Sequence, residues 1–190
     1  VTVLFTFSIG DANENILKCA NYLFEQKDFY RAGVEYERYI FLDGDCDEAF
    51  LKGGASYYYR GKYERSILLF QKINTNSPNY THALRFSSLS LLKSMQYERC
   101  LKLNSLNPIS ENGLINFFCY YQVHDYAAAG KSLNDILQKP ENNLQDTARE
   151  LYDLFNKRMN FQRKSYFKGF AASLFPGAGH FYCHRKSDGF

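Results

Sequence analysis

Apolar side chains recur with two periods along the chain. The short period is that of a helix, and the longer one separates matching segments by a fixed number of residues. Residues 28–40 and 62–74 each carry an aromatic residue, a small residue three positions later and a second aromatic four positions after that. The leading aromatic is Phe29 in one segment and Tyr63 in the other, a step of 63 − 29 = 34 residues, and the next step leads to Tyr97. The short spacing predicts helices, and the long one predicts a structural repeat.

The same step runs through the segments that precede these aromatic residues. Small residues recur in one register, and large residues recur three positions later. The small residues are Ala20, Gly54 and Ser88, and the large ones are Leu23, Tyr57 and Leu91. Two helices per unit are therefore expected, in which small side chains let the helices approach closely and large ones interlock around them.

Together these registers resemble the tetratricopeptide repeat family, whose unit of 34 residues is a helix-turn-helix hairpin. The family pattern has small residues at unit positions 8 and 20, large ones at 11, 17 and 24, and Pro at 32. Units at 13–46, 47–80 and 81–108 carry the pattern here, and Pro78 completes it in the second unit. The resemblance implies an all-α fold: a right-handed α-solenoid of tetratricopeptide-like hairpins.

The turn between the two helices of a unit favours Gly, because the first helix needs a C-cap there. Gly61 meets this preference, whereas Lys27 and Met95 stand at the same place in the first and third units. In the fourth unit we expect the turn at His124 and Asp125.

The pattern loosens in the later units. Asn104 stands where the family usually has an aromatic residue, which predicts a weak second helix in the third unit. The fourth unit, at 110–140, is predicted as two helices that flank its turn. Its Tyr126 follows Tyr97 after 126 − 97 = 29 residues, which is shorter than the period, and Pro108 accounts for the early break.

The segments outside the repeats indicate export and membrane contact. Residues 1–12 are apolar and then polar, which resembles the end of a signal peptide; a short strand or apolar arm of a soluble protein is the alternative. Within 141–175, a helix at 144–160 is expected to cap the last repeat. The segment from Lys168 onwards, which runs into the Pro/Gly turn and basic tail at 176–190, resembles the start of a small bacterial membrane-hairpin motif. The alternative is a soluble C-terminal helix with a capping turn.

In the resembled family, ligands lie in a concave groove lined by the first helix of each unit. The resemblance places twelve candidate contact residues there: Leu17, Asn21, Phe24, Leu51, Tyr58, Tyr59, Arg85, Leu89, Leu92, Lys93, Phe118 and Tyr121. Such an apolar, aromatic groove suits an amphipathic helix or an extended hydrophobic segment. Two alternatives are that the chain's own C-terminal helix fills the groove, and that these residues form inter-repeat core. We expect no carboxylate clamp, because Ala55 and Leu89 occupy positions that would have to be polar.

Composition narrows the function further. Aromatic residues make up 17% of the 190-residue chain, and the net charge of +3 is too small to indicate a nucleic-acid partner. The five cysteines do not indicate a complete disulfide framework, and Cys19, Cys100 and Cys119 are expected to be buried.

Motifs that could carry chemistry are weak. The acidic run 43–48 lacks the spacing of a calcium loop, so Asp45 or Asp47 is expected to cap a helix instead. The cluster of His180, Cys183 and His184 lacks a fourth metal ligand. We therefore expect no metal, no cofactor and no enzyme activity.

The sequence thus predicts a non-catalytic scaffold that binds a protein or peptide partner, at the cell envelope of a bacterium. The alternative hypothesis for its cellular location is the cytoplasm. The second hypothesis for function is a membrane-embedded protein whose repeat domain serves a C-terminal membrane hairpin.

Overall fold

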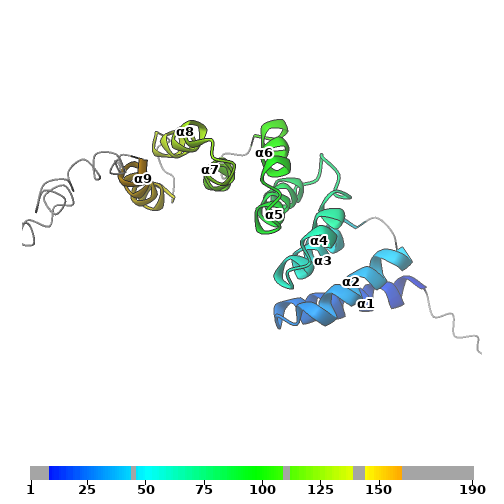
Figure 1. Cartoon of the computed structure of the whole chain (residues 1–190). Coiled ribbons are helices and arrows are strands. Elements are labelled where there is room, and N and C mark those ends of the chain that lie inside the picture. Colours follow the sequence, from blue (N-terminus) through cyan, green and yellow to red (C-terminus); the bar gives the residue numbers. More distant parts are fainter. Residues whose placement is uncertain (1–8, 44–45, 109–111, 139–143, 160–190) are drawn as a thin grey trace, which may run out of the picture. The chain divides into compact units, whose positions relative to one another are not determined.

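The computed structural model describes residues 9–43, 46–108, 112–138 and 144–159, and in these ranges helices joined by turns and loops are the only regular secondary structure (Figure 1). The helices are α1 (Ile9–Glu25), α2 (Phe29–Asp43), α3 (Asp47–Tyr59), α4 (Tyr63–Phe70), α5 (Tyr80–Lys93), α6 (Tyr97–Leu106), α7 (Gly113–Gln122), α8 (Tyr126–Leu137) and α9 (Gln145–Met159). The chain divides into two compact units, 1–149 and 150–190.

Consecutive helices from α1 to α8 pack against one another, as expected for a chain of hairpins. The first helices of the hairpins also contact each other in order: α1 contacts α3, α3 contacts α5, and α5 contacts α7. We call these four first helices the odd helices. The prediction of an all-α fold with repeat-like packing is confirmed for the described residues.

All four hairpins turn through the same backbone motif. Lys27, Gly61, Met95 and His124 have φ of 59°, 73°, 61° and 64°, in the left-handed region. In the second hairpin the Gly61 N–H donates to the Tyr58 carbonyl and the Lys62 N–H to the Tyr57 carbonyl, both at 2.9 Å. This is the Schellman pair that closes a helix C-terminus, and the other three turns repeat it. The predicted turns are confirmed, including the fourth after a shorter step.

Small residues sit where the two helices of a hairpin meet. The predicted small positions are all buried: Ala20, Ala32, Gly54, Ser66, Ser88 and Cys100. The closest approach is at Gly54, where an added Cβ would lie 2.5 Å from a ring carbon of Phe70. Since no side chain tolerates such a distance without movement, α3 and α4 are held by a backbone-to-ring contact that only Gly permits.

Three local predictions are wrong. Cys19 is exposed, whereas Cys100 and Cys119 are fully buried as expected. The N-cap of α3 is Cys46, which makes no side-chain cap, and Asp47 lies inside the first turn of the helix. Asn104 does not weaken α6, which runs unbroken from Tyr97 to Leu106, because the amide is buried and hydrogen-bonded.

Helix α9 lies in the segment predicted to be helical. It buries Ala148, while Leu154 remains largely exposed. The predicted segments at 1–8 and 160–190, with the tail and its His and Cys cluster, lie outside the described residues. Capping of the last repeat by α9 therefore stays a prediction.

Replacing Met95 by Gly should stabilise the protein by about 0.5–1 kcal/mol. The left-handed conformation is costly for a residue with a Cβ, and the Met95 side chain is 75% exposed, so little packing is lost. Urea unfolding monitored by circular dichroism measures the change. Met95→Leu keeps the Cβ and should leave stability unchanged; a destabilised Met95→Gly protein would contradict the assignment of this turn.

Gly54→Ala should destabilise the protein by about 1–3 kcal/mol, although Ala favours helices, because the new methyl group would overlap the Phe70 ring. Gly33→Ala is the matched control. At Gly33, which lies within α2, the nearest atom to an added Cβ is 3.5 Å away, so helix propensity should raise stability by about 0.5–1 kcal/mol. Relative to the parent chain, the midpoint temperature of thermal unfolding should fall for Gly54→Ala and rise for Gly33→Ala. A shift of both midpoints in the same direction would contradict the close approach.

Candidate functional site

The structure places the twelve predicted contact residues on the odd helices. Leu17, Asn21 and Phe24 lie on α1, and the α3 residues are Leu51, Tyr58 and Tyr59. Helix α5 carries Arg85, Leu89, Leu92 and Lys93, and α7 carries Phe118 and Tyr121. Because each odd helix contacts the next, these residues belong to one continuous set of packed helices.

Aromatic rings connect the first three hairpins. Phe24 of α1 packs edge-on against Phe29, with ring centres 5.5 Å apart, and Phe29 stacks on Tyr59 of α3 at 4.4 Å. Tyr59 contacts Tyr58, which meets Phe86 of α5 at 5.5 Å. We call these five residues the aromatic row. Aromatic pairs of this geometry add to the energy of burial, so the row also helps to hold adjacent hairpins together.

Members of the aromatic row differ in exposure, and this decides which can reach a ligand. Tyr59 is 53% exposed, whereas Tyr58 is half-buried. Burial raises the pKa of Tyr58, and the neighbouring Tyr63 and Tyr59 raise it further. Its phenol therefore stays neutral and can donate a hydrogen bond.

A second aromatic cluster lies in the fourth hairpin. Phe117 is buried and packs against Phe118 at 5.2 Å and against Tyr121 at 6.0 Å. Phe118 is 40% exposed, and Tyr121 continues to Tyr126 at 5.6 Å. Of the predicted contact residues, Tyr59 and Phe118 thus expose the largest aromatic surfaces.

The aliphatic members of the predicted set are partly core. Leu17 packs against the buried cluster around Tyr36, and Leu51 packs against the one around Phe50. Leu89 and Leu92 pack in the same way against a third cluster that includes Cys100 and Cys119. The inter-repeat alternative therefore describes these four leucines better than ligand contact does.

The polar members fall into two groups. Asn21 is engaged within the fold: its Oδ1 accepts a hydrogen bond from the Tyr36 hydroxyl at 2.6 Å and one from Lys52 Nζ at 3.0 Å. Burial is the main cause that raises the pKa of Tyr36, so this phenol remains a donor. Arg85 and Lys93 are both exposed on α5 and give this helix a basic surface.

A buried polar seam joins the third and fourth hairpins. Asn104 Oδ1 accepts from the Ser88 hydroxyl at 2.5 Å and from Asn112 Nδ2 at 2.9 Å, and Asn104 Nδ2 donates to Asn116 Oδ1 at 2.6 Å. Ser88, Asn104 and Asn112 are all buried. In the described chain, Asn112 Oδ1 is the one buried side-chain oxygen or nitrogen without a hydrogen-bond partner. The amide at Asn104 thus replaces the usual aromatic by bonding to three neighbours.

Two thiols meet beside this seam. Cys100 of α6 and Cys119 of α7 are fully buried in one cluster, and the Cys100 thiol donates a hydrogen bond to the Ser88 carbonyl at 3.4 Å. The neighbouring Cys100 thiol, together with burial, raises the pKa of Cys119. A protonated, inaccessible thiol is a packing group rather than a nucleophile.

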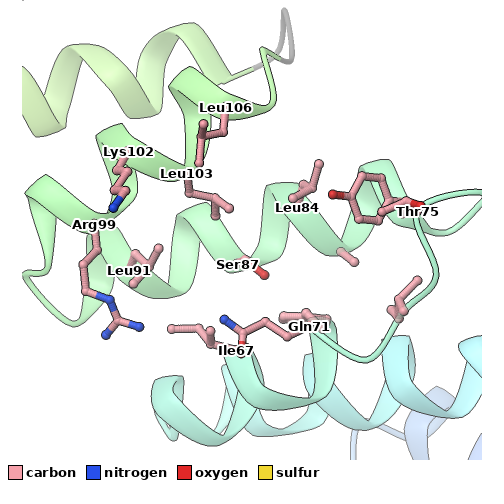
Figure 2. Close-up of a pocket in the computed structure, with 14 residues that line it drawn as sticks. Ile67, Gln71, Thr75, Leu84, Ser87, Leu91, Arg99, Lys102, Leu103 and Leu106 are labelled. Atoms are coloured by element: carbon pink, nitrogen blue, oxygen red, sulfur yellow. The ribbon is translucent and has the colours of Figure 1, made fainter.

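The structure also shows a cleft that sequence reasoning missed, between α4 and α6 above α5 (Figure 2). The tetratricopeptide resemblance places contact residues only on the first helix of each unit, whereas the cleft is lined largely by the second helices α4 and α6. A signal was present: Arg99, Lys102, Leu103 and Leu106 follow the i, i+3, i+4, i+7 spacing of a single helix face, and all four line the cleft.

Two features are absent from the described residues. No group of His, Cys, Asp and Glu there could hold a metal ion. None of the helices in that part of the chain combines the length and apolar character needed to span a membrane.

Replacing Asn104 by Leu should destabilise the protein by about 1–3 kcal/mol, although Leu suits a buried helix position. The change leaves Ser88, Asn112 and Asn116 without their partner, and buried polar groups that lose their hydrogen bonds are costly. Asn134→Leu, at an exposed position of α8, is the matched control and should change stability by less than about 0.5 kcal/mol. Urea unfolding compares the two; equal stability of the Asn104 variant and the parent chain would contradict the seam.

No protein-family model matches the chain, and a search of curated proteins finds no match. The tetratricopeptide resemblance therefore rests on features of the chain itself. These are the small and large residues that recur at a step of 34 positions along the sequence.

Proposed function

We propose that the chain is a non-catalytic scaffold, a right-handed solenoid of tetratricopeptide-like hairpins that binds a peptide or helix of a protein partner. The binding surface in this proposal is formed by the odd helices. The observation that supports it is the aromatic row, which extends over three hairpins and leaves Tyr59 half exposed.

The physical argument rests on how peptides are held by helical surfaces. Rigid aromatic side chains offer large contact areas at low entropic cost, and they dominate binding energies where they are partly enclosed. Tyr59 is fixed from one side by its stacking on Phe29, so its other surface is held ready for a partner. Phe118 offers a comparable anchor on α7.

The basic residues of this surface favour a partner segment with an acidic group. Arg85 and Lys93 lie on the same odd helix and are exposed, while Asn21 is committed to Tyr36 and Lys52. The partner segment in this proposal is therefore mostly apolar, with an acidic group near α5. Recognition of a chain terminus by a fixed polar clamp is not part of it.

The test uses peptides selected on the full-length chain from a displayed random library and then measured singly by fluorescence anisotropy. Tyr59→Ser should weaken their binding by about tenfold or more, as expected for loss of an aromatic anchor. Tyr30→Ser is the matched control, because Tyr30 of α2 is also well exposed and lies outside the aromatic row.

Circular dichroism and thermal unfolding of both variants establish that the fold is retained. Equal loss of binding in the Tyr30 and Tyr59 variants, or unchanged binding in both, would overturn the assignment of the odd helices as the binding surface. Phe118→Ser extends the test to the fourth hairpin.

A further inference from the structure

The cleft between α4 and α6 has the size of a ligand site. It encloses about 460 Å³, within the usual range for binding pockets. Figure 2 shows Leu84, Ser87 and Leu91 of α5 along its floor, with α6 on one side and α4 on the other. The cleft lies outside the surface proposed for the odd helices, because two of its three helices are second helices of their hairpins.

The lining is largely apolar and partly open to solvent. Ile67 and Phe70 of α4 are buried beneath it, and Leu103 of α6 borders it. Leu106, at the end of α6, is 71% exposed. The apolar lining of the cleft therefore continues to the protein surface at Leu106.

A polar group on the floor lacks a partner. Ser87 makes no side-chain hydrogen bond to the described residues, and its hydroxyl oxygen is open to the cleft, because Asn112 Oδ1 is the one fully buried side-chain atom there that lacks a partner. In Figure 2 this hydroxyl is directed from α5 into the space over Gln71, which follows α4. A hydroxyl that opens into a cleft can donate or accept a hydrogen bond with the polar backbone of a ligand.

The charge at one end of the cleft is positive. Arg99 and Lys102 of α6 line it, and no acidic residue does. Arg99 forms an exposed ion pair with Glu64 at 3.8 Å and also donates a hydrogen bond to the Gln96 side chain. Lys102 makes no side-chain hydrogen bond or ion pair with any described residue.

We propose that this cleft is a second docking site, which binds an extended acidic peptide segment of a protein partner. Apolar side chains of the segment enter between Leu84, Leu91 and Leu103, its main-chain amides bond to Ser87 and Gln71, and its carboxylate pairs with Lys102 and Arg99. An acyl chain with a carboxylate would match the charge but would leave the Ser87 hydroxyl without a partner, so the peptide fits the lining better.

The experiment uses a short fluorescein-labelled peptide in which leucine alternates with glutamate, and a matched peptide in which leucine alternates with glutamine. In an extended chain this alternation places leucines on one face and the polar side chains on the other. With the full-length chain at low salt, anisotropy should show about tenfold tighter binding of the glutamate peptide, and added salt should remove the advantage.

Variants locate the binding. Lys102→Glu should abolish the preference for glutamate, while Lys131→Glu, the same charge change at an exposed position of α8, should preserve it. Ser87→Ala should weaken both peptides, and Tyr59→Ser should affect neither, which separates this site from the odd helices. Circular dichroism confirms that each variant is folded.

Three results would overturn the proposal. The first is equal binding of the two peptides by the parent chain. The second is equal loss in the Lys102 and Lys131 variants, which would indicate a general charge effect. The third is binding of a fluorescent fatty acid that Lys102→Glu abolishes, with no binding of either peptide; this would assign the cleft to an amphiphile.

Discussion

The fold depends on how closely the two helices of each hairpin can approach. In the second hairpin Gly54 brings the α3 backbone against the Phe70 ring, at a distance that no Cβ could share. In the first hairpin, the corresponding small and large residues are Ala20 and Tyr36, which belong to the same buried cluster. A small residue and a large residue, separated by 70 − 54 = 16 positions, thus fix the depth and register of packing. The other features of the array, including its turns and aromatic contacts, are arranged around this contact.

The third hairpin meets the same constraint with different chemistry. Its small residue is Ser88, and the large partner is replaced by Asn104, so the contact becomes a hydrogen bond that extends to Asn112 and Asn116. Burial of these polar side chains stabilises the fold less than burial of an aromatic ring would. Their paired hydrogen bonds, however, specify a unique arrangement of the packed helices. The polar seam also lies where the repeat period shortens, and it joins the three regular hairpins to the irregular fourth one. Within that fourth hairpin, Gly113 approaches Ile136 closely.

Much of the fold could be predicted from the sequence because the repeat recurs in several registers at once. Three matching copies identified the buried small positions, and the left-handed turn could be located even where Lys27 and Met95 replace Gly. Cys19 is exposed because it lies off the inward face of α1, which carries Ile16, Leu17 and Ala20; membership of an apolar segment does not by itself imply burial. The role of Asn104 could not be read from pattern alone, since its partners come from another helix.

The candidate site could be predicted only in part. Position in the repeat identified Tyr59 and Phe118 as residues of the odd helices, but whether Leu17 or Leu51 packs inward depends on neighbouring hairpins that the sequence does not place. The cleft over α5 lies between α4 and α6, so it depends on the separation of these two helices. No repeat position encodes that separation.

The close approach of α3 and α4 is the central claim, and nuclear Overhauser spectroscopy tests it most directly. A contact between the Gly54 backbone and the Phe70 ring predicts strong cross-peaks from the Gly54 Hα protons to the Phe70 ring protons, with the Hα resonances displaced by the ring current. Absence of those cross-peaks in the folded protein, with Gly54 Hα at ordinary helical shifts, would contradict the packing from which the rest of the structure follows.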